Sequence, residues 1–405
     1  MVSLLKQPVG NSKGILVFTH KERQFLLDPI PPLQRKFQSI KEAYLVGMHW
    51  GHFAEDVGPT PFVDFHLAGQ GTVSFTDEVD VPVLNYCSRN FVPEYFTPSN
   101  KEAKWDIVTI APPTRLKHLS ELLNVVRETR DQGVDLTALF ICPRPKSLQS
   151  RKWDHKFIET CENDLSKSER EAIKIIWPLR TDDEIYPIPH RIIPYFFNIA
   201  NSFALFSEQE GESRVISEAL MTGTPVIARS NLKGGGLDYL DNSNSLLFSS
   251  TEEAIEIFTK ISNNPNEYAF DPDYLRDELY APQSSKHFQA EVERVFNHYD
   301  IPYEGTLENE QLAFLLPGHA LTLPTDLRAS GVNDLRSQVA AVKFCEEVLE
   351  YPPKDNPVRL QYYRTREYFR DLLTSESITT QIGNLLWRVE QHTPINIYSR
   401  IQSIR

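Results

Sequence analysis

Two glutamates and the stretch between them are the best candidates for chemistry in this chain. Glu210 lies in an acidic loop, and seven residues separate it from Glu218, which falls within a predicted short helix. The first amides of a helix lack helical partners and point, with the helix dipole, at whatever lies beyond that end. A diphosphate-sized anion fits there. The spacing therefore predicts an anion site flanked by two carboxylates, one on the loop and one on the helix.

The elements that must position these acids can be read from residues 203–229. An apolar, strand-like tetrapeptide leads into the acidic loop, and Ser213 is predicted to cap the helix that follows. The free amides at its start are those of Ser213, Arg214 and Val215. A glycine and a proline end the helix, and a second apolar run, 225–228, follows at once. This order predicts a βαβ unit, in which ligands bind at the loop leaving the first strand.

The ordered residues around the glutamate pair resemble the retaining GT-B glycosyltransferases of group 1, the family-4-like enzymes related to glycogen and sucrose synthases. Their signature is a Glu, seven residues, a second Glu, and then Ala-(Leu or Met)-x-x-Gly-x-Pro-Val-(Ile or Val)-Ala. The matching tail here is Ala219, Leu220, Gly223, Pro225, Val226, Ile227 and Ala228. The resemblance implies an α/β, GT-B-like fold of two Rossmann-like halves. It also implies sugar transfer from a nucleoside diphosphate to an acceptor hydroxyl with retention of anomeric configuration.

The same resemblance assigns roles to the acidic pair and to two cations. Glu210 would hold the hydroxyls of the donor sugar, and Glu218 would bind the ribose of the nucleotide. Lys117 stands where the family carries a lysine that contacts the donor diphosphate. The arginine that accompanies this lysine in the family is absent at its usual register, so Arg115 is the expected substitute. Gly211, beside the first glutamate, is expected to lie against the donor.

Two further segments are expected to reach the donor. Consecutive glycines allow close approach of the backbone to a ligand, and the family places such a turn beside the sugar or phosphate, here at Gly234 and Gly235. The loop 178–189 would hold the nucleobase, with Leu179 and Arg180 as weak candidates for that contact.

Several histidines follow the predicted second strand of the chain. In "AYLVGMHWG", His49 is similar to a family histidine that meets the donor sugar, and His66 is the competing candidate. Hydrogen-bonded loop histidines without a catalytic role are an equally open interpretation of both. Together with His52 they invite a metal hypothesis, but the segment does not supply the helical spacing with a carboxylate that metal-binding histidines require. We expect no metal and no cofactor.

Composition narrows the class of protein. A chain of 405 residues with 40% hydrophobic content can bury two ordinary cores. A formal charge of −13 disfavours a nucleic-acid partner, which would need a dense basic face. The four cysteines are widely spaced, and no segment has the apolar length of a signal peptide or membrane span. We therefore expect a cytoplasmic protein with reduced thiols and no integral membrane segment. Such a protein could still bind peripherally to a membrane surface.

Three regions are predicted along the chain. Residues 1–98 form a short amino-terminal half on the acceptor side, and its last stretch, RNFVPEYFTP (residues 89–98), resembles the linker that joins the two halves in this family. Residues 99–299 form the nucleotide-sugar-binding half, closed by helices near 251–261 and 284–298. Residues 300–405 form a helical extension, with helices near 335–349, 358–373 and 378–391. This extension would either complete the short first half or mediate contact with a second copy or partner subunit.

Two other classes remain open at this stage. One is a different nucleotide-sugar enzyme on the same scaffold, such as an epimerase or a phosphorylase. The other is a non-catalytic GT-B-like module that binds a glycan or a partner. The sequence leaves the sugar, the base and the acceptor undetermined, and that acceptor could be a glycan, a lipid-linked sugar or a small molecule.

Overall fold

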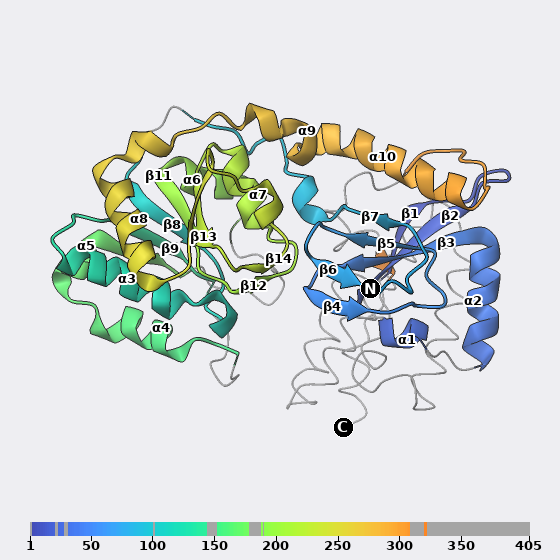
Figure 1. The fold of residues 1–405 in the computed structure, drawn as a ribbon, viewed down its shortest axis with the longest axis horizontal. Coiled ribbons are helices and arrows are strands. Elements are labelled where there is room, and N and C mark those ends of the chain that lie inside the picture. The colour runs from blue at the N-terminus through green and yellow to red at the C-terminus, as the bar shows by residue number, and fades with distance from the viewer. Residues whose placement is uncertain are drawn as a thin grey trace, which may run out of the picture.

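The computed structural model describes residues 2–20, 23–27, 31–99, 102–143, 152–177, 188, 190–307 and 320–321. Two six-stranded sheets organise the described chain: the first is built from strands up to Leu84 together with residues 320–321, and the second from strands between Trp105 and Phe248. Figure 1 shows the two halves side by side. The nucleobase candidates Leu179 and Arg180, and the helices predicted beyond residue 335, lie outside the described residues. The boundaries near 98 and 299 stay predictions.

The second sheet is parallel throughout. Its strands are β8 (Trp105–Ile110), β9 (Ala138–Ile141), β10 (Ile173–Ile176), β11 (Ala200–Leu205), β13 (Val226–Arg229) and β15 (Ser245–Phe248). They lie in the order β10-β9-β8-β11-β13-β15, so the chain builds outward in one direction from β8 and then returns to build outward from β11. This is the doubly wound, Rossmann-type order. The order reverses between β8 and β11, where such sheets bind ligands beyond their carboxyl ends.

Helices cover both faces of this sheet. The first face carries α3 (Leu119–Asp131), α4 (His155–Glu159) and α8 (Thr251–Asn263), and the second carries α6 (Ile193–Asn198), α7 (Arg214–Met221) and α9 (Arg276–Leu279). The short helix α5 (Lys167–Ala172) leads into β10. Neighbouring strand residues alternate between the two cores: Ile107 packs on the first face and Val108 on the second. Burial on both faces explains the uninterrupted apolar runs in these strands.

The first sheet is mixed. Its strands are β1 (Val2–Lys6), β2 (Gly14–Thr19), β3 (Tyr44–Trp50), β5 (Phe65–Ala68), β7 (Val83–Leu84) and β16 (Ala320–Leu321), in the order β16-β1-β2-β3-β5-β7. Strands β2, β3, β5 and β7 are parallel, whereas β1 is antiparallel to both of its neighbours. Leu16 and Phe18 face the core on the side of α2 (Pro31–Ala43), and Leu26 of α1 (Arg23–Leu27) is buried in the same core. Strands β4 (Ala54–Val57) and β6 (Val73–Phe75) form a separate pair.

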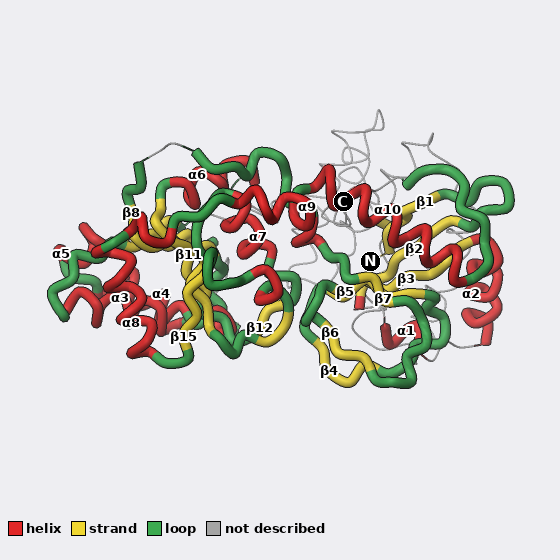
Figure 2. Tube along the Cα trace, turned by 45° about the horizontal axis from the view of Figure 1, so that its top comes forward, coloured by secondary structure: helices red, strands yellow, loops and turns green. Residues whose placement is uncertain are grey.

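The long helix α10 (Ala281–His298) differs from its prediction. We expected a helix at 284–298 to close the nucleotide-binding half, but Phe288, Val292 and Phe296 pack against Ile15 and Val17 of the first sheet. Figures 1 and 2 show α10 reaching from α9 across to that half. The other face of β2 is covered by α2, so the apolar residues facing away from α2 need this cover. The first half therefore obtains one side of its core from a distant part of the sequence.

The chain after α10 stays with the first sheet as far as it is described. Leu307 is buried in the same core as α10, and Ile301 packs against it. Strand β16 then pairs with β1, placing Leu321 opposite Val2. Of the two hypotheses for the extension, this placement agrees with packing against the short first half. Its remaining residues lie outside the described part of the chain.

Candidate functional site

The predicted lysine and the first predicted glutamate meet at the point where the strand order reverses. Lys117 ends the short turn 115–117 that follows β8, and Glu210 follows β11 in the short strand β12 (Gln209–Glu210). Lys117 Nζ lies 2.5 Å from Glu210 Oε1. Both side chains are largely buried, with 21% and 10% exposure. A flexible cation and a carboxylate are thus held together at the edge of the sheet that such folds use for ligands.

The second predicted glutamate has its own partners. Glu218, on α7, is hydrogen-bonded at Oε1 to His190 Nε2 (2.8 Å) and forms an ion pair at the same oxygen with Arg214 Nη2 (3.2 Å). Arg214 lies one turn earlier on the same helix, at the i,i+4 spacing that brings side chains together. The Glu218 side chain is only 7% exposed. Both acids of the motif are therefore ordered by cations or by nitrogen donors, and neither points freely into solvent.

Ser213 does not cap α7 as predicted. Its backbone is left-handed (φ 40°, ψ 49°), its hydroxyl makes no capping hydrogen bond, and the residue is buried. Left-handed backbone costs an L-residue with a Cβ about 1–2 kcal/mol relative to glycine-like freedom, so the turn is strained. The helix itself starts at Arg214 and runs to Met221, with its apolar face against β11 and β13. The amides of Arg214 and Val215 have no helical partner by its geometry, whereas Ile216 N donates to Ser213 O at 3.0 Å.

The acidic loop and the glycine turn, far apart in sequence, are joined by backbone pairing. Strand β12 lies parallel to β14 (Lys233–Gly234), and Gly235 N donates to Gly211 O at 3.0 Å. Gly234 has φ +95°, and a Cβ there would overlap the carbonyl oxygen of Glu210. Only glycine allows this approach. The pairing brings Gly211, Gly234 and Gly235 together beside Glu210.

His49 faces this loop from the first half. It is the last residue but one of the buried strand β3, and its Nε2 lies 2.5 Å from Oε1 of Glu212. Ser88, in the turn leading out of the first half, donates to the other Glu212 oxygen. Burial by itself would raise the pKa of Glu212, but His49 and two nearby arginines hold it below its ordinary value. Sequence reasoning placed His49 near the donor, but it did not foresee that Glu212 reaches across to it.

His66, the competing candidate, is a core residue. It is fully buried, it accepts a hydrogen bond from Trp50 Nε1 at 3.2 Å, and its ring stacks on Phe75. Burial, together with the charge of Arg23, lowers its pKa to about 4. It is therefore neutral and enclosed at physiological pH, which rules out the direct contact with a donor sugar that the alternative required.

Two buried contacts between the halves were missed from sequence. The fully buried Arg89 donates from Nη2 to Asp238 Oδ2 and to the Gln70 carbonyl, both at 2.8 Å. Asn90 donates to the hydroxyl of Tyr239 at 2.6 Å. Both donors stand in the segment that was interpreted only as a linker. A buried arginine there needs a carboxylate partner, which is the signal that could have drawn attention to Asp238.

Arg115 is the predicted residue that the structure does not bring to the cluster. It is exposed, and no contact in the described part of the chain links its side chain to Lys117, Glu210 or Glu218. Its predicted role with the diphosphate therefore remains a prediction.

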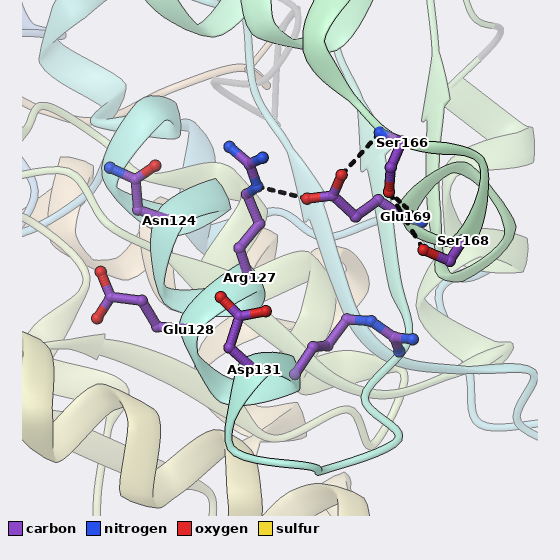
Figure 3. Close-up of a pocket in the computed structure, with 8 residues that line it drawn as sticks. Asn124, Arg127, Glu128, Asp131, Ser166, Ser168 and Glu169 are labelled. Carbon is purple, nitrogen blue, oxygen red and sulfur yellow. Dashed lines mark hydrogen bonds and ion pairs between the residues drawn. The ribbon is translucent and has the colours of Figure 1, made fainter.

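The other parts of the described chain contain weaker candidates for a functional site. Among these residues no group of three or more His, Cys, Asp or Glu side chains could hold a metal ion. Figure 3 shows a polar hollow between α3 and α5, where Arg127 Nε lies 2.5 Å from Glu169 Oε1. It lies on the outer helices, away from the ends of β8 and β11. Over the same described ranges, we find no helix with the length and apolarity needed to cross a membrane.

Comparison with known proteins identifies the fold. No protein-family model and no curated protein matches the sequence. Among solved structures, TarM matches with a TM-score of 0.50 and 12% identity over 70% of this chain and 54% of TarM. The pneumococcal O-GlcNAc transferase GtfA, in complex with UDP and GlcNAc, matches with a TM-score of 0.47 and 14% identity over 65% of this chain and 55% of GtfA. An α,α-trehalose 6-phosphate synthase from Burkholderia multivorans has a TM-score of 0.47 and 11% identity, covering 66% of this chain and 70% of the synthase.

The likeness to TarM, together with the sheet order, establishes a GT-B-like α/β fold and nothing finer. The chain spans little more than half the length of GtfA and TarM, 55% and 54% respectively. The fold class expected from the sequence is thereby confirmed for the two sheet-containing halves. What the protein does must be argued from its own site.

Proposed function

We propose that this protein is a GT-B glycosyltransferase that moves a sugar from a nucleoside diphosphate to an acceptor hydroxyl, with retention at the anomeric carbon. One observation carries the proposal. At the reversal point of a doubly wound sheet, Lys117, which follows β8, pairs with Glu210, and the βαβ unit that carries Glu210 also supplies the start of α7 and Glu218. Fold alone does not define an activity, so the weight rests on this group of side chains and on their order in the motif.

The cations and amides of the site suit a diphosphate leaving group. As the bond from the sugar to the diphosphate breaks, negative charge grows on the phosphate oxygens, and preorganised donors lower that barrier. Lys117 and the first amides of α7 supply such donors. In the structure the lysine is paired with Glu210. We infer that the donor takes over Lys117 and leaves Glu210 to accept hydrogen bonds from the sugar hydroxyls.

The remaining roles follow the motif. Glu218 would bind the ribose, Gly211, Gly234 and Gly235 would allow the backbone to approach the donor, and His49 would reach the sugar from the first half. A lysine and a helix end can together offset diphosphate charge, so we propose that no divalent metal is needed. We further propose a cytoplasmic enzyme acting on a glycan, lipid-linked or small-molecule acceptor.

A binding and turnover assay tests the proposal. The full chain is incubated with UDP-, GDP- and ADP-sugars, thermal unfolding is recorded, and sugar release or transfer is measured with and without EDTA. We expect at least one donor to raise the melting temperature, because a ligand that binds only the native state stabilises it. Turnover should fall about 100-fold or more in Glu210→Gln, as expected for loss of a contact made in the transition state.

The control stands in the same loop. Glu208→Gln makes the same chemical change two residues away, on a side chain that is 63% exposed. It should leave turnover within about twofold, as is usual for surface substitutions. Equal activity in Glu210→Gln and the unaltered protein would refute the proposed role of the site.

The non-catalytic alternative also has structural support. The halves touch directly at the donor loop, where Thr72 Oγ1 donates to Gly211 O at 3.2 Å and a Cβ on Gly211 would overlap the Gly51 carbonyl. A module that only binds a partner could keep this junction closed. Thermal stabilisation by a nucleotide sugar without any hydrolysis or transfer would favour that second function.

A further inference from the structure

We propose that His190 is a positioning residue that holds Glu218 in register for the ribose of the donor, and that Tyr95 fixes the ring of His190 for this task. The inference rests on the proposed function, because it refines the role of Glu218 within that site. It concerns three side chains from three separate segments: the linker, the turn before α6, and α7.

The three side chains form a continuous hydrogen-bonded chain. Tyr95 Oη lies 2.6 Å from His190 Nδ1, and His190 Nε2 lies 2.8 Å from Glu218 Oε1. Glu218 carries no proton to give when ionised, so it must accept from Nε2, which therefore bears the hydrogen. In the neutral ring Nδ1 is then an acceptor, and the Tyr95 hydroxyl donates to it. With this assignment each of the two contacts has one donor and one acceptor, and Arg214 Nη2, which lies 3.3 Å from Nε2, has no acceptor there.

The surroundings favour this direction of donation. Burial raises the pKa of Tyr95, and the charge of Glu218 raises it further, so the phenol keeps its proton. The His190 ring packs against Tyr95 and Phe96, with ring centroids 5.7 Å and 5.0 Å away, and these two rings also contact each other at 5.2 Å. Phe96 is itself fully buried. The aromatic pair supports one side of the His190 ring, and the hydrogen bonds at its two nitrogens fix its orientation.

Glu218 has a second partner that the donor would compete for. Arg214 Nη2 lies 3.2 Å from the same oxygen, Oε1. Arg214 stands at the first position of α7, where a diphosphate would draw a guanidinium toward itself. If Arg214 turns to the phosphates, His190 remains as the donor to Oε1. Within the described part of the chain no hydrogen bond reaches Oε2, the oxygen left for a ribose hydroxyl.

The geometry leads to a specific expectation about nucleotide recognition. A carboxylate held in place by His190 should discriminate ribose from a sugar that lacks both hydroxyls. Loss of a hydrogen bond to a charged group typically changes affinity by about tenfold or more. The unaltered protein should therefore bind the ribonucleoside diphosphate at least about tenfold more tightly than its 2′,3′-dideoxy counterpart. A variant that leaves Glu218 unsupported should lose most of that ratio.

The experiment measures dissociation constants by calorimetry for UDP, GDP and ADP, for their 2′,3′-dideoxy counterparts, and for inorganic pyrophosphate. The variants are His190→Leu, His190→Gln and Tyr95→Phe. Glutamine can place its amide nitrogen where Nε2 stands and still donate to Glu218, so it serves as the rescue. His287→Gln, an exposed histidine on α10, and Tyr268→Phe, on the outer side of the second half, are matched controls.

We expect His190→Leu to reduce the ribose preference about tenfold, His190→Gln to keep it, and Tyr95→Phe to give an intermediate value. Pyrophosphate affinity should stay constant in all of them, which separates positioning from general damage to the fold. An unchanged ribose preference in His190→Leu would overturn this inference and leave the proposed function standing. Equal binding of ribose and dideoxyribose forms by the unaltered protein would also overturn it. No nucleoside diphosphate binding at all would remove the proposed function, and this inference with it.

Discussion

Replacing Gly234 with alanine tests how the two loops of the site are joined. The residue has φ +95°, and an added Cβ would overlap the carbonyl oxygen of Glu210. Gly133 offers a matched control, because it also has a positive φ, +88°, but a Cβ there would meet nothing within 4 Å. Gly133→Ala therefore carries the backbone penalty alone, about 1–2 kcal/mol. Any excess in Gly234→Ala measures the clash.

The size of that excess follows from the hydrogen bonds at risk. To relieve the overlap, β14 must move away from β12, which breaks the bonds from Lys233 N to Glu208 O (2.8 Å) and from Gly235 N to Gly211 O (3.0 Å). Each such bond contributes about 1 kcal/mol net, so Gly234→Ala should lose about 3–4 kcal/mol in all. Displacing Glu210 by about 1 Å should also lower turnover about 100-fold.

The assay is urea unfolding followed by tryptophan fluorescence, with sugar transfer measured on the same preparations. Gly133→Ala should lose stability but keep its turnover, because Gly133 ends α3 far from the loop. Equal stability losses in the two variants, with normal turnover in both, would show that β12 and β14 are not in the contact described here.

Three further predictions concern single side chains. Lys117→Met should lower kcat/KM about 100-fold or more by removing a donor to the leaving diphosphate, and steady-state kinetics would show it; a loss below threefold would contradict that role. Ser213→Gly should raise the free energy of unfolding by about 0.5–1 kcal/mol, seen as a higher urea midpoint, because glycine relieves the left-handed backbone; a lower midpoint would contradict the strain. The pKa of His66 is lowered to about 4, so the unfolded chain binds a proton that the native state refuses, and native stability falls as pH drops from 6.5 to 4. His66→Asn should make this fall smaller, by up to about 3 kcal/mol, in unfolding measured at several pH values; an unchanged pH dependence would contradict it.

The parts of the fold that could be predicted depend on local pattern. The βαβ unit of residues 203–229 has apolar runs, a loop and a glycine stop that interact mostly with one another, so its strands and helix fall close to their predicted places. Lys117 and Glu210 lie at one edge of the second sheet because neighbouring parallel strands, here β8 and β11, end on the same side of a sheet. Local sequence was sufficient there.

What could not be predicted depends on long-range contact. The partner of Glu212 is His49, more than 160 positions away by the printed numbering, and Arg89 finds Asp238 across the same junction. Neither pair leaves a periodic signal. The left-handed backbone at Ser213 was missed because serine is a frequent cap, and only the packing around α7 decides against that role. The contact between Glu218 and His190 was also missed, because it too joins separate segments of the chain.

The course of α10 has a consequence for how the protein can be divided and synthesised. An amino-terminal fragment ending near residue 98 would expose Ile15, Val17 and Leu45, since their cover arrives only with Phe288 and Val292. During translation, the apolar surface of the first half is covered only after nearly two hundred further residues have been synthesised. Until then the first half depends on chaperones or on transient collapse. A split version of the molecule that supplied residues 281–307 together with the first fragment should be the one that refolds from two pieces.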